Sequence, residues 1–96
     1  MTPYYLCARI RATDLQRLDE TRRKLNALQT LTQKEPACHE FRILEDKERK
    51  GDFLLWESWD GKAGLEAHYA AEHTRNYMEQ GLTDVIELTE LNALEA

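Results

Sequence analysis

Three side chains able to exchange a proton gather in the third quarter of the chain. Glu57 stands between two tryptophans in an apolar run, and His68 and His73 follow in a more polar segment. Histidine has an ordinary pKa near neutral pH, so His68 is the natural general base. Glu57 could orient a histidine or hold a protonated one. A phenol or hydroquinone reacts faster with dioxygen once deprotonated, so these residues suggest proton abstraction from a small aromatic molecule.

Aromatic side chains near these groups could form the walls of a binding site. Phe41 and Trp59, on expected strands, and Tyr69 and Tyr77, on an expected helix, would provide stacking surface, with the tyrosine hydroxyls as hydrogen-bond donors. His39 shares a strand face with Phe41 and could join them. Residues such as Phe41 and Trp59 belong to a core more often than to a ligand-stacking surface.

Each polar candidate also has a purely structural explanation. His68 could bridge helix and sheet through hydrogen bonds, and His73 could be a half-exposed helix residue. Glu57 could pair with Arg75, since a buried carboxylate needs a partner. The two histidines are five residues apart, about 140° around an ideal helix, so both face one cavity only if the helix bends between them.

The spacing of potential ligands does not predict a metal site. His68 and Glu72 are four residues apart on the expected helix, but no third ligand is placed to complete a site. Cys7 and Cys38 lie on different expected strands without a CxxC motif, which indicates reduced core thiols.

Apolar periodicity predicts an alternation of strands and helices that would position these residues. The order strand, helix, strand, strand, helix, strand is typical of a ferredoxin-like α+β fold (βαββαβ), an antiparallel sheet with two helices on one face. The expected strands are residues 4–10, 38–46, 52–59 and 84–94, and the expected helices are residues 13–35 and 61–80.

Local signals predict where both helices begin and end. Thr13 is expected to cap the backbone N–H of Gln16, and Pro36 to end the first helix because it disfavours a helical residue before it. Asp60 is expected to cap the second helix and Gly81 to end it. The apolar stripe of the first helix comprises Leu15, Leu18, Leu25, Leu28 and Leu31.

The apolar residues of the strands predict that the face of the sheet opposite the helices is also covered. The third strand places Phe53 and Leu55 on one face and Leu54 and Trp56 on the other, whereas a sheet with one wet face should alternate apolar and polar residues. A large exposed apolar patch is unusual in a monomer. We therefore expect a homodimer in which two sheets pack face to face.

Composition argues against two classes of partner. Thirteen Lys and Arg against eighteen Asp and Glu give a net charge of −5, which predicts binding to neither nucleic acid nor an anionic membrane. No apolar run approaches the roughly 18 residues of a membrane helix, and the start of the chain does not resemble a leader. We expect a cytoplasmic protein with a single domain, residues 1–96.

Several short motifs together resemble the antibiotic biosynthesis monooxygenase (ABM) family. They are Glu57-Ser58-Trp59, Leu65-Glu66-Ala67-His68, Glu72-His73 and Glu35-Pro36-Ala37-Cys38. The chain is most similar to the small quinol monooxygenases and the related enzyme acting on phosphorylated autoinducer-2. The resemblance implies a dimeric α/β-barrel and, for many members, oxygenation of an electron-rich aromatic without flavin, haem or metal.

Two positions depart from the family pattern. Ala37 replaces the glycine of the E-x-G-C turn, and Ala71-Glu72 replaces the Thr-Pro that normally breaks the helix before the second histidine.

The leading hypothesis is a cofactor-independent monooxygenase acting on a small quinol-like or polyketide-like aromatic ligand. An isomerase or tautomerase of a small carbonyl compound would use the same proton transfer without oxygen. A non-catalytic ligand-binding protein is a third possibility. Haem degradation is weaker, because the asparagine and tryptophan associated with it are absent from residues 6–9 and 68–71.

Overall fold

The computed structural model describes residues 3–94, and the elements in this range follow the predicted order with one interruption. Met1 and Thr2, and with them the outer limits of the predicted domain 1–96, lie outside the described residues. The elements are β1 (Pro3–Ala12), the 3-10 turn η1 (Leu15–Arg17), α1 (Leu18–Thr32), β2 (Cys38–Glu45), β3 (Asp52–Asp60), α2 (Gly61–Ala70), α3 (Glu72–Glu79) and β4 (Thr83–Leu91).

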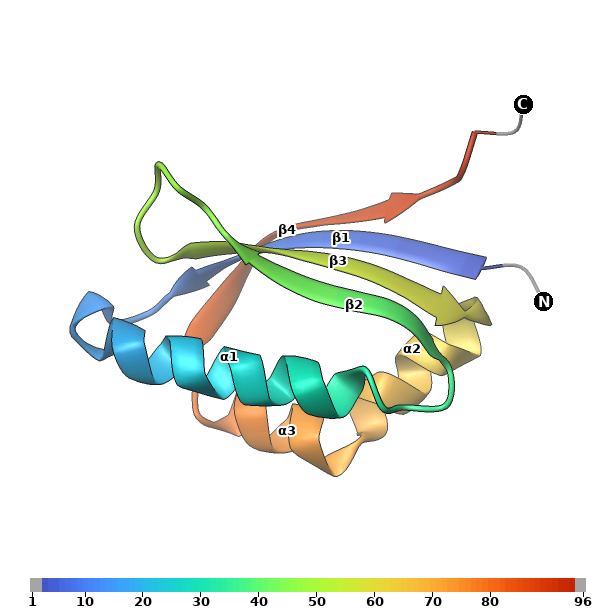
Figure 1. Ribbon diagram of the computed structural model, residues 1–96, viewed down its shortest axis with the longest axis horizontal. Coiled ribbons are helices and arrows are strands. Elements are labelled where there is room, and N and C mark those ends of the chain that lie inside the picture. The colour runs from blue at the N-terminus through green and yellow to red at the C-terminus, as the bar shows by residue number, and fades with distance from the viewer. Residues whose placement is uncertain (1–2, 95–96) are drawn as a thin grey trace.

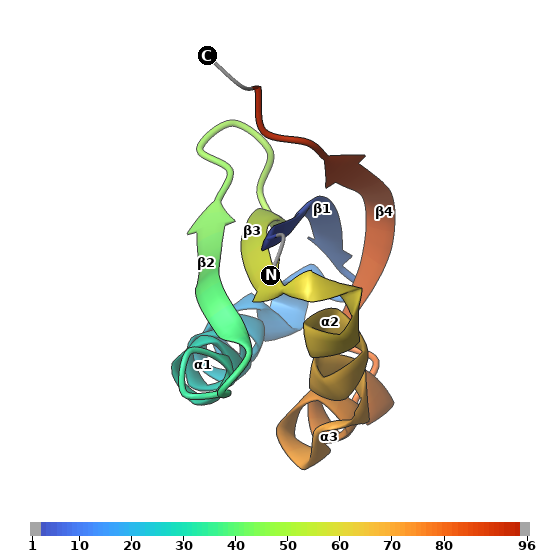
Figure 2. The ribbon, with the colours of Figure 1, turned by 90° about the vertical axis from the view of Figure 1, so that its right-hand side faces the viewer.

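The four strands form one antiparallel sheet in the order β2-β3-β1-β4. This order confirms the predicted ferredoxin-like α+β fold. The α-helices all lie on one side of the sheet (Figures 1 and 2). The register of the central pair places Leu6 opposite Glu57 and Ala8 opposite Leu55, so these residues share the face that the helices cover.

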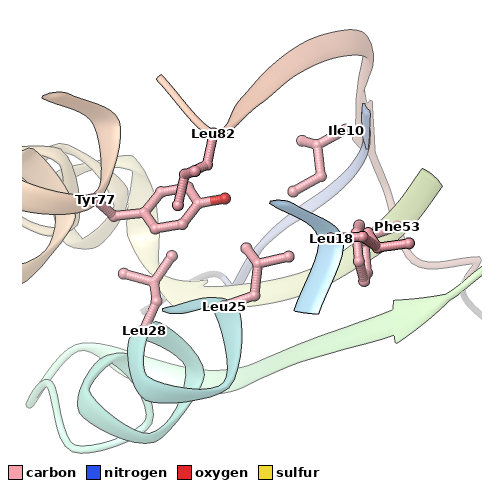
Figure 3. Packing of buried hydrophobic residues seen from close by; sticks show 7 residues of the cluster. All are labelled: Ile10, Leu18, Leu25, Leu28, Phe53, Tyr77 and Leu82. Atoms are coloured by element: carbon pink, nitrogen blue, oxygen red, sulfur yellow. The ribbon is translucent and has the colours of Figure 1, made fainter. Parts of the chain in front are cut away.

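Two clusters of buried side chains fill the space between the sheet and the helices. The larger one joins α1 and α3 to the strands, and Figure 3 shows the ring of Tyr77 within it. Its members are Ile10, Leu18, Leu25, Leu28, Phe53, Tyr77 and Leu82. The smaller cluster lies toward the other end of the sheet and consists of Leu6, Phe41, Trp59 and Leu65.

The beginning of the first helix differs from the prediction. Asp14, not Thr13, caps the 3-10 turn η1 by accepting a hydrogen bond from the backbone N–H of Gln16, and Arg17, the N-cap of α1, makes no side-chain capping bond. The Thr13 hydroxyl instead donates to the carbonyl oxygen of Gly81 at 2.8 Å. This bond needs the chain end of α3 to lie beside η1, a tertiary contact that the local pattern does not contain.

The apolar stripe of the first helix is narrower than predicted. Leu18, Leu25 and Leu28 are buried, but Leu15 is 53% and Leu31 46% exposed. Leu15 belongs to the 3-10 turn, whose different period moves its side chain away from the sheet.

The predicted single helix over residues 61–80 is wrong, because it breaks at Ala71. This residue is extended (φ −67°, ψ 144°), and α2 and α3 meet there without a proline. The Ala71 N–H donates to the carbonyl oxygen of His68, and the Arg75 side chain donates to that of Ala70. These bonds satisfy backbone groups that the break exposes. Gly81, with φ +62°, ends α3 as predicted.

Asp60 occupies the predicted N-cap position of α2, but its side chain makes no capping hydrogen bond.

The opposite face of the sheet combines aromatic stacking with ion pairs. The rings of Tyr5 and Trp56 stack with centroids 5.9 Å apart, and Trp56 Nε1 donates to Glu40 at 2.7 Å. Arg9 and Arg11 both contact the carboxylate of Asp52. The predicted homodimer through this face stays a prediction.

Leu25 and Leu31 provide a matched pair to test the core. Leu25→Ala should lower the free energy of unfolding by about 2–5 kcal/mol, because it removes a buried side chain that joins α1 to the larger core cluster. Leu31→Ala, on the same helix, should change it by less than about 1 kcal/mol because the side chain is largely in water. Urea unfolding followed by circular dichroism measures both. Equal losses would contradict the observed orientation of α1.

Candidate active site

An apolar cavity of about 170 Å³ lies between the sheet and the helices, and Glu57 is part of its wall. The register of β3 aims Glu57 toward the helices beside Leu55. The described side chains that surround it are Ala8, Ile10, Leu25, Leu28, Leu55, Tyr69, Thr74, Tyr77, Met78, Thr83, Val85 and Leu88. Glu57 carries the carboxylate among these residues, so it is the acidic group that a ligand in the cavity would contact.

Burial controls the protonation of Glu57. Its side chain accepts a hydrogen bond from Trp59 Nε1 at 2.9 Å, and the residue is 4% exposed. Burial raises the pKa of Glu57 to about 7, the Trp59 hydrogen bond opposes this rise, and the nearby charge of Glu35 adds to it. The carboxyl group is therefore divided between its acid and base forms near neutral pH.

Tyr69 and Tyr77 line the same cavity, as the sequence analysis expected for a binding surface. The Tyr77 hydroxyl lies 2.9 Å from Thr83 Oγ1. Burial raises the pKa of both phenols, and the Glu57 charge adds to the rise at Tyr69. Both therefore remain neutral at physiological pH and can donate hydrogen bonds.

Phe41 and Trp59 occupy a different place from the tyrosines. They are 1% and 0% exposed and belong to the smaller core cluster, not to the cavity wall. Both rings contact His68, with centroids 5.5 Å and 4.7 Å away. They therefore pack against His68 on the side away from the cavity, and Trp59 also donates a hydrogen bond to Glu57. His39 is exposed on β2 and lies away from the cavity wall.

The two histidines converge on Glu35, a residue to which the sequence analysis assigned no role. His68 Nδ1 and His73 Nε2 each lie 2.7 Å from Glu35 Oε2. The break at Ala71 turns the two rings toward the same point, which a continuous helix would prevent. Glu35 did stand in one of the family-like motifs, but its partners are 33 and 38 residues away.

The Glu35 carboxylate determines where the imidazoles carry their protons. A carboxylate oxygen only accepts, so the nitrogens facing it hold the hydrogens, and His68 Nε2 keeps its lone pair. Thr74 Oγ1 lies 3.2 Å from the same His68 Nδ1. Burial lowers the pKa of His68, while the hydrogen bond and charge of Glu35 oppose this shift. His68 is consequently neutral at physiological pH.

Of the three proposed catalytic residues, the structure therefore brings two together and separates the third from them. His68 and His73 share Glu35, whereas Glu57 binds Trp59 and faces the cavity. Arg75 donates to a backbone carbonyl and is not the partner of Glu57 in this structure. The pair considered in the sequence, His68 and Glu72, is not the one that the structure groups: the facing atoms are those of Glu35, His68 and His73, which lie within 4.8 Å of one another.

The fold and this site define an α+β protein of ferredoxin-like topology with a buried acid at an apolar cavity. Residues 3–80 match the antibiotic biosynthesis monooxygenase family, and the chain belongs to that family. The resemblance found in the sequence motifs is thereby confirmed. Among residues 3–94, no helix is long and apolar enough to cross a membrane.

Similar proteins support this assignment. Over 84 residues the chain is 31% identical to the uncharacterized protein YjcS of Bacillus subtilis (strain 168), covering 85% of this chain and 78% of YjcS. A solved structure of protein YjcS superposes with a TM-score of 0.88 at 25% identity, covering 97% of this chain and all of the other. PA3566 from Pseudomonas aeruginosa gives a TM-score of 0.87 at 26% identity, covering 99% and 97%.

The raised pKa of Glu57 predicts a pH-dependent stability. Between an ordinary value of 4.5 and about 7, the folded protein keeps a proton that the unfolded chain has released. The free energy of unfolding should therefore fall as the pH rises through this window. Glu57→Gln, which still accepts from Trp59, should be more stable than wild type above pH 7 by about 3 kcal/mol, with little difference near pH 4.5.

Urea unfolding of both proteins at several pH values measures this difference. Other titrating groups, including His68, are common to both proteins, so the difference isolates Glu57. A constant difference from pH 4.5 to 8 would contradict the assigned protonation.

Proposed function

We propose that this protein is a cofactor-independent monooxygenase that acts on a small quinol-like aromatic, with Glu57 as the general base. The observation that carries the proposal is a ring-sized apolar cavity whose wall contains one carboxyl group with a pKa of about 7. Such a group is half ionised at neutral pH, where a general base works best. Membership of the antibiotic biosynthesis monooxygenase family supports the reaction class.

The size of the cavity favours one aromatic ring. At about 170 Å³ it is close to the roughly 150 Å³ cavity that accommodates benzene in an engineered protein core. A hydroquinone fits a space of this size, whereas a polyketide of several fused rings requires a larger opening. Among the ligands expected from the sequence, the quinol-like class is therefore the better match.

The reaction begins with proton transfer to Glu57. A phenolic hydroxyl with a pKa of about 10 is about 3 units above the carboxyl group, so the transfer costs about 4 kcal/mol before any stabilisation of the anion. The neutral hydroxyls of Tyr69 and Tyr77 can donate hydrogen bonds to that anion. Glu57 itself is only 4% exposed, which limits the access of water to its carboxyl group.

The electron-rich anion then supplies the electrons that dioxygen needs. One oxygen atom forms a bond to a ring carbon, and the O–O bond breaks so that the other oxygen leaves as water. Hydroquinone plus dioxygen thus gives hydroxybenzoquinone plus water. The substrate itself provides all four electrons, and the proton held by Glu57 returns to the departing oxygen. This balance requires no flavin, haem or metal.

In this mechanism the histidines do not touch the substrate but hold other residues in position. His68 packs against Trp59, whose indole N–H binds Glu57, and Glu35 holds His68 in place. We assign His68, His73 and Glu35 as positioning residues because none of them lies in the cavity wall.

Oxygen uptake with a panel of substituted hydroquinones tests this function. The wild-type protein should consume oxygen above the autoxidation blank, with kcat rising through an apparent pKa near 7 as Glu57 ionises. Glu57→Gln should lower kcat by about 10²- to 10⁴-fold, the contribution of a general base. His39→Ala, an exposed control, should behave as wild type. Uptake equal to the blank across the panel would eliminate the proposal.

An isomerase is the second candidate, because a carboxyl group of pKa about 7 is equally able to move a proton within a small carbonyl compound. Strictly anaerobic incubation separates the two reactions. Turnover that persists without oxygen and needs Glu57 would identify an isomerase, whereas turnover that stops and resumes on aeration would identify the oxygenase. Saturable ligand binding without product under both conditions would indicate a binding protein.

A further inference from the structure

We propose that Glu35, His68 and His73 form a binding site for a divalent transition-metal ion. The three side chains come from the loop after α1, from α2 and from α3. Their facing atoms are Glu35 Oε2, His68 Nδ1 and His73 Nε2, which all lie within 4.8 Å of one another. Two imidazoles and one carboxylate that face a common point are a frequent ligand set for such ions.

A rearrangement of three side chains that already face one another converts the hydrogen-bonded cluster into a coordination site. Both ring nitrogens now lie 2.7 Å from the carboxylate oxygen. An ion bound to each atom at about 2.0–2.2 Å holds neighbouring ligand atoms roughly 3 Å apart or slightly more. Withdrawal of the carboxylate oxygen by less than about 1 Å, together with an approach of the two ring nitrogens, which lie within 4.8 Å of one another, would bring all three atoms to these separations.

The surroundings of the cluster suit an ion that enters from solvent. The side chains of His73, Glu35 and His68 are 22%, 12% and 5% exposed, so access increases toward His73. Phe41 and Trp59 pack against the innermost ring and hold its orientation. A ring held in this way loses little conformational freedom when it binds an ion.

The ligand types select among metals. Imidazole nitrogen favours Zn²⁺, Fe²⁺, Co²⁺, Ni²⁺ and Cu²⁺, whereas Mg²⁺ and Ca²⁺ prefer oxygen ligands throughout. One carboxylate offsets part of the ionic charge. Three protein ligands leave at least one coordination position open for water, as in catalytic rather than structural zinc sites.

Metal binding and the present hydrogen bonds exclude each other. The two ring nitrogens now point their hydrogens at Glu35, and each must present a lone pair to an ion. An imidazole in its neutral form does this by moving its proton to the other ring nitrogen. Protonated imidazoles cannot bind, so the affinity should decrease as the pH falls.

The three ligands are also the positioning residues of the proposed function, but none of them lies in the wall of the Glu57 cavity, so ion binding is measured independently of turnover. Failure of the oxygenase test would leave the metal proposal standing, and the reverse also holds. The proposal concerns binding, and direct measurements of binding decide it.

Titration of the chelator-treated protein with Co²⁺ and with Zn²⁺ tests the site. Co²⁺ should produce visible d–d absorption that saturates at one ion per chain, and calorimetry should give a dissociation constant for Zn²⁺ in the micromolar range or below. His73→Ala should weaken binding by more than about 100-fold, beyond the loss that a supporting residue causes. Glu35→Gln, which keeps the shape of the side chain, should weaken it similarly.

Matched controls identify the ligands. His39→Ala removes an exposed histidine outside the cluster and should bind as wild type. His73 is partly exposed, so its replacement should leave the fold intact, which circular dichroism checks. Binding weaker than about 1 mM, or equal binding by wild type and His73→Ala, would overturn the proposal. An intense thiolate-to-Co²⁺ charge-transfer band would assign the ion to Cys7 or Cys38 and would overturn it as well.

Discussion

A single carboxylate oxygen joins three separate segments of this protein. Glu35 Oε2 binds one imidazole from α2 and one from α3, and it belongs to the loop that connects α1 to β2. This connection depends on the break at Ala71, because a continuous helix would point the two rings in different directions. Once His68 is held, it supports Trp59, and Trp59 in turn binds Glu57 at the cavity.

The buried Glu57 and the partly buried Glu35 have different hydrogen-bond partners. Glu35 receives two imidazole hydrogen bonds, whereas Glu57 receives one from an indole and otherwise faces apolar side chains. Burial therefore dominates at Glu57 and raises its pKa to about 7. A group of this kind is a common feature of catalytic sites. The proposed division of labour follows: Glu57 exchanges a proton, and the Glu35 cluster positions residues or binds an ion.

The edge strand β4 shows where the described chain is least covered. Val85 and Leu88 contribute to the cavity wall, yet they are 64% and 55% exposed, and Ile86 is 46% exposed. Apolar side chains of an edge strand are usually protected by another element. Val85 and Leu88 pair with Ile10 and Ala8 and so lie on the helix side, whereas the predicted homodimer packs against the opposite face of the sheet.

The sequence by itself determined the order of the elements, the antiparallel α+β fold and the family, since periodicity, turn residues and short motifs are local properties of the chain. It also predicted Glu57, Tyr69 and Tyr77 as site residues from the strand period and the polar second helix, and the structure places all three in the cavity wall. Only the tertiary structure decided the partner of each group. Glu35 contacts His68 and His73, which are 33 and 38 residues away in the sequence. Thr13 donates a hydrogen bond to the chain end of α3, and the Leu15 side chain is exposed rather than part of the core. Such contacts depend on how distant segments pack, which no local pattern records.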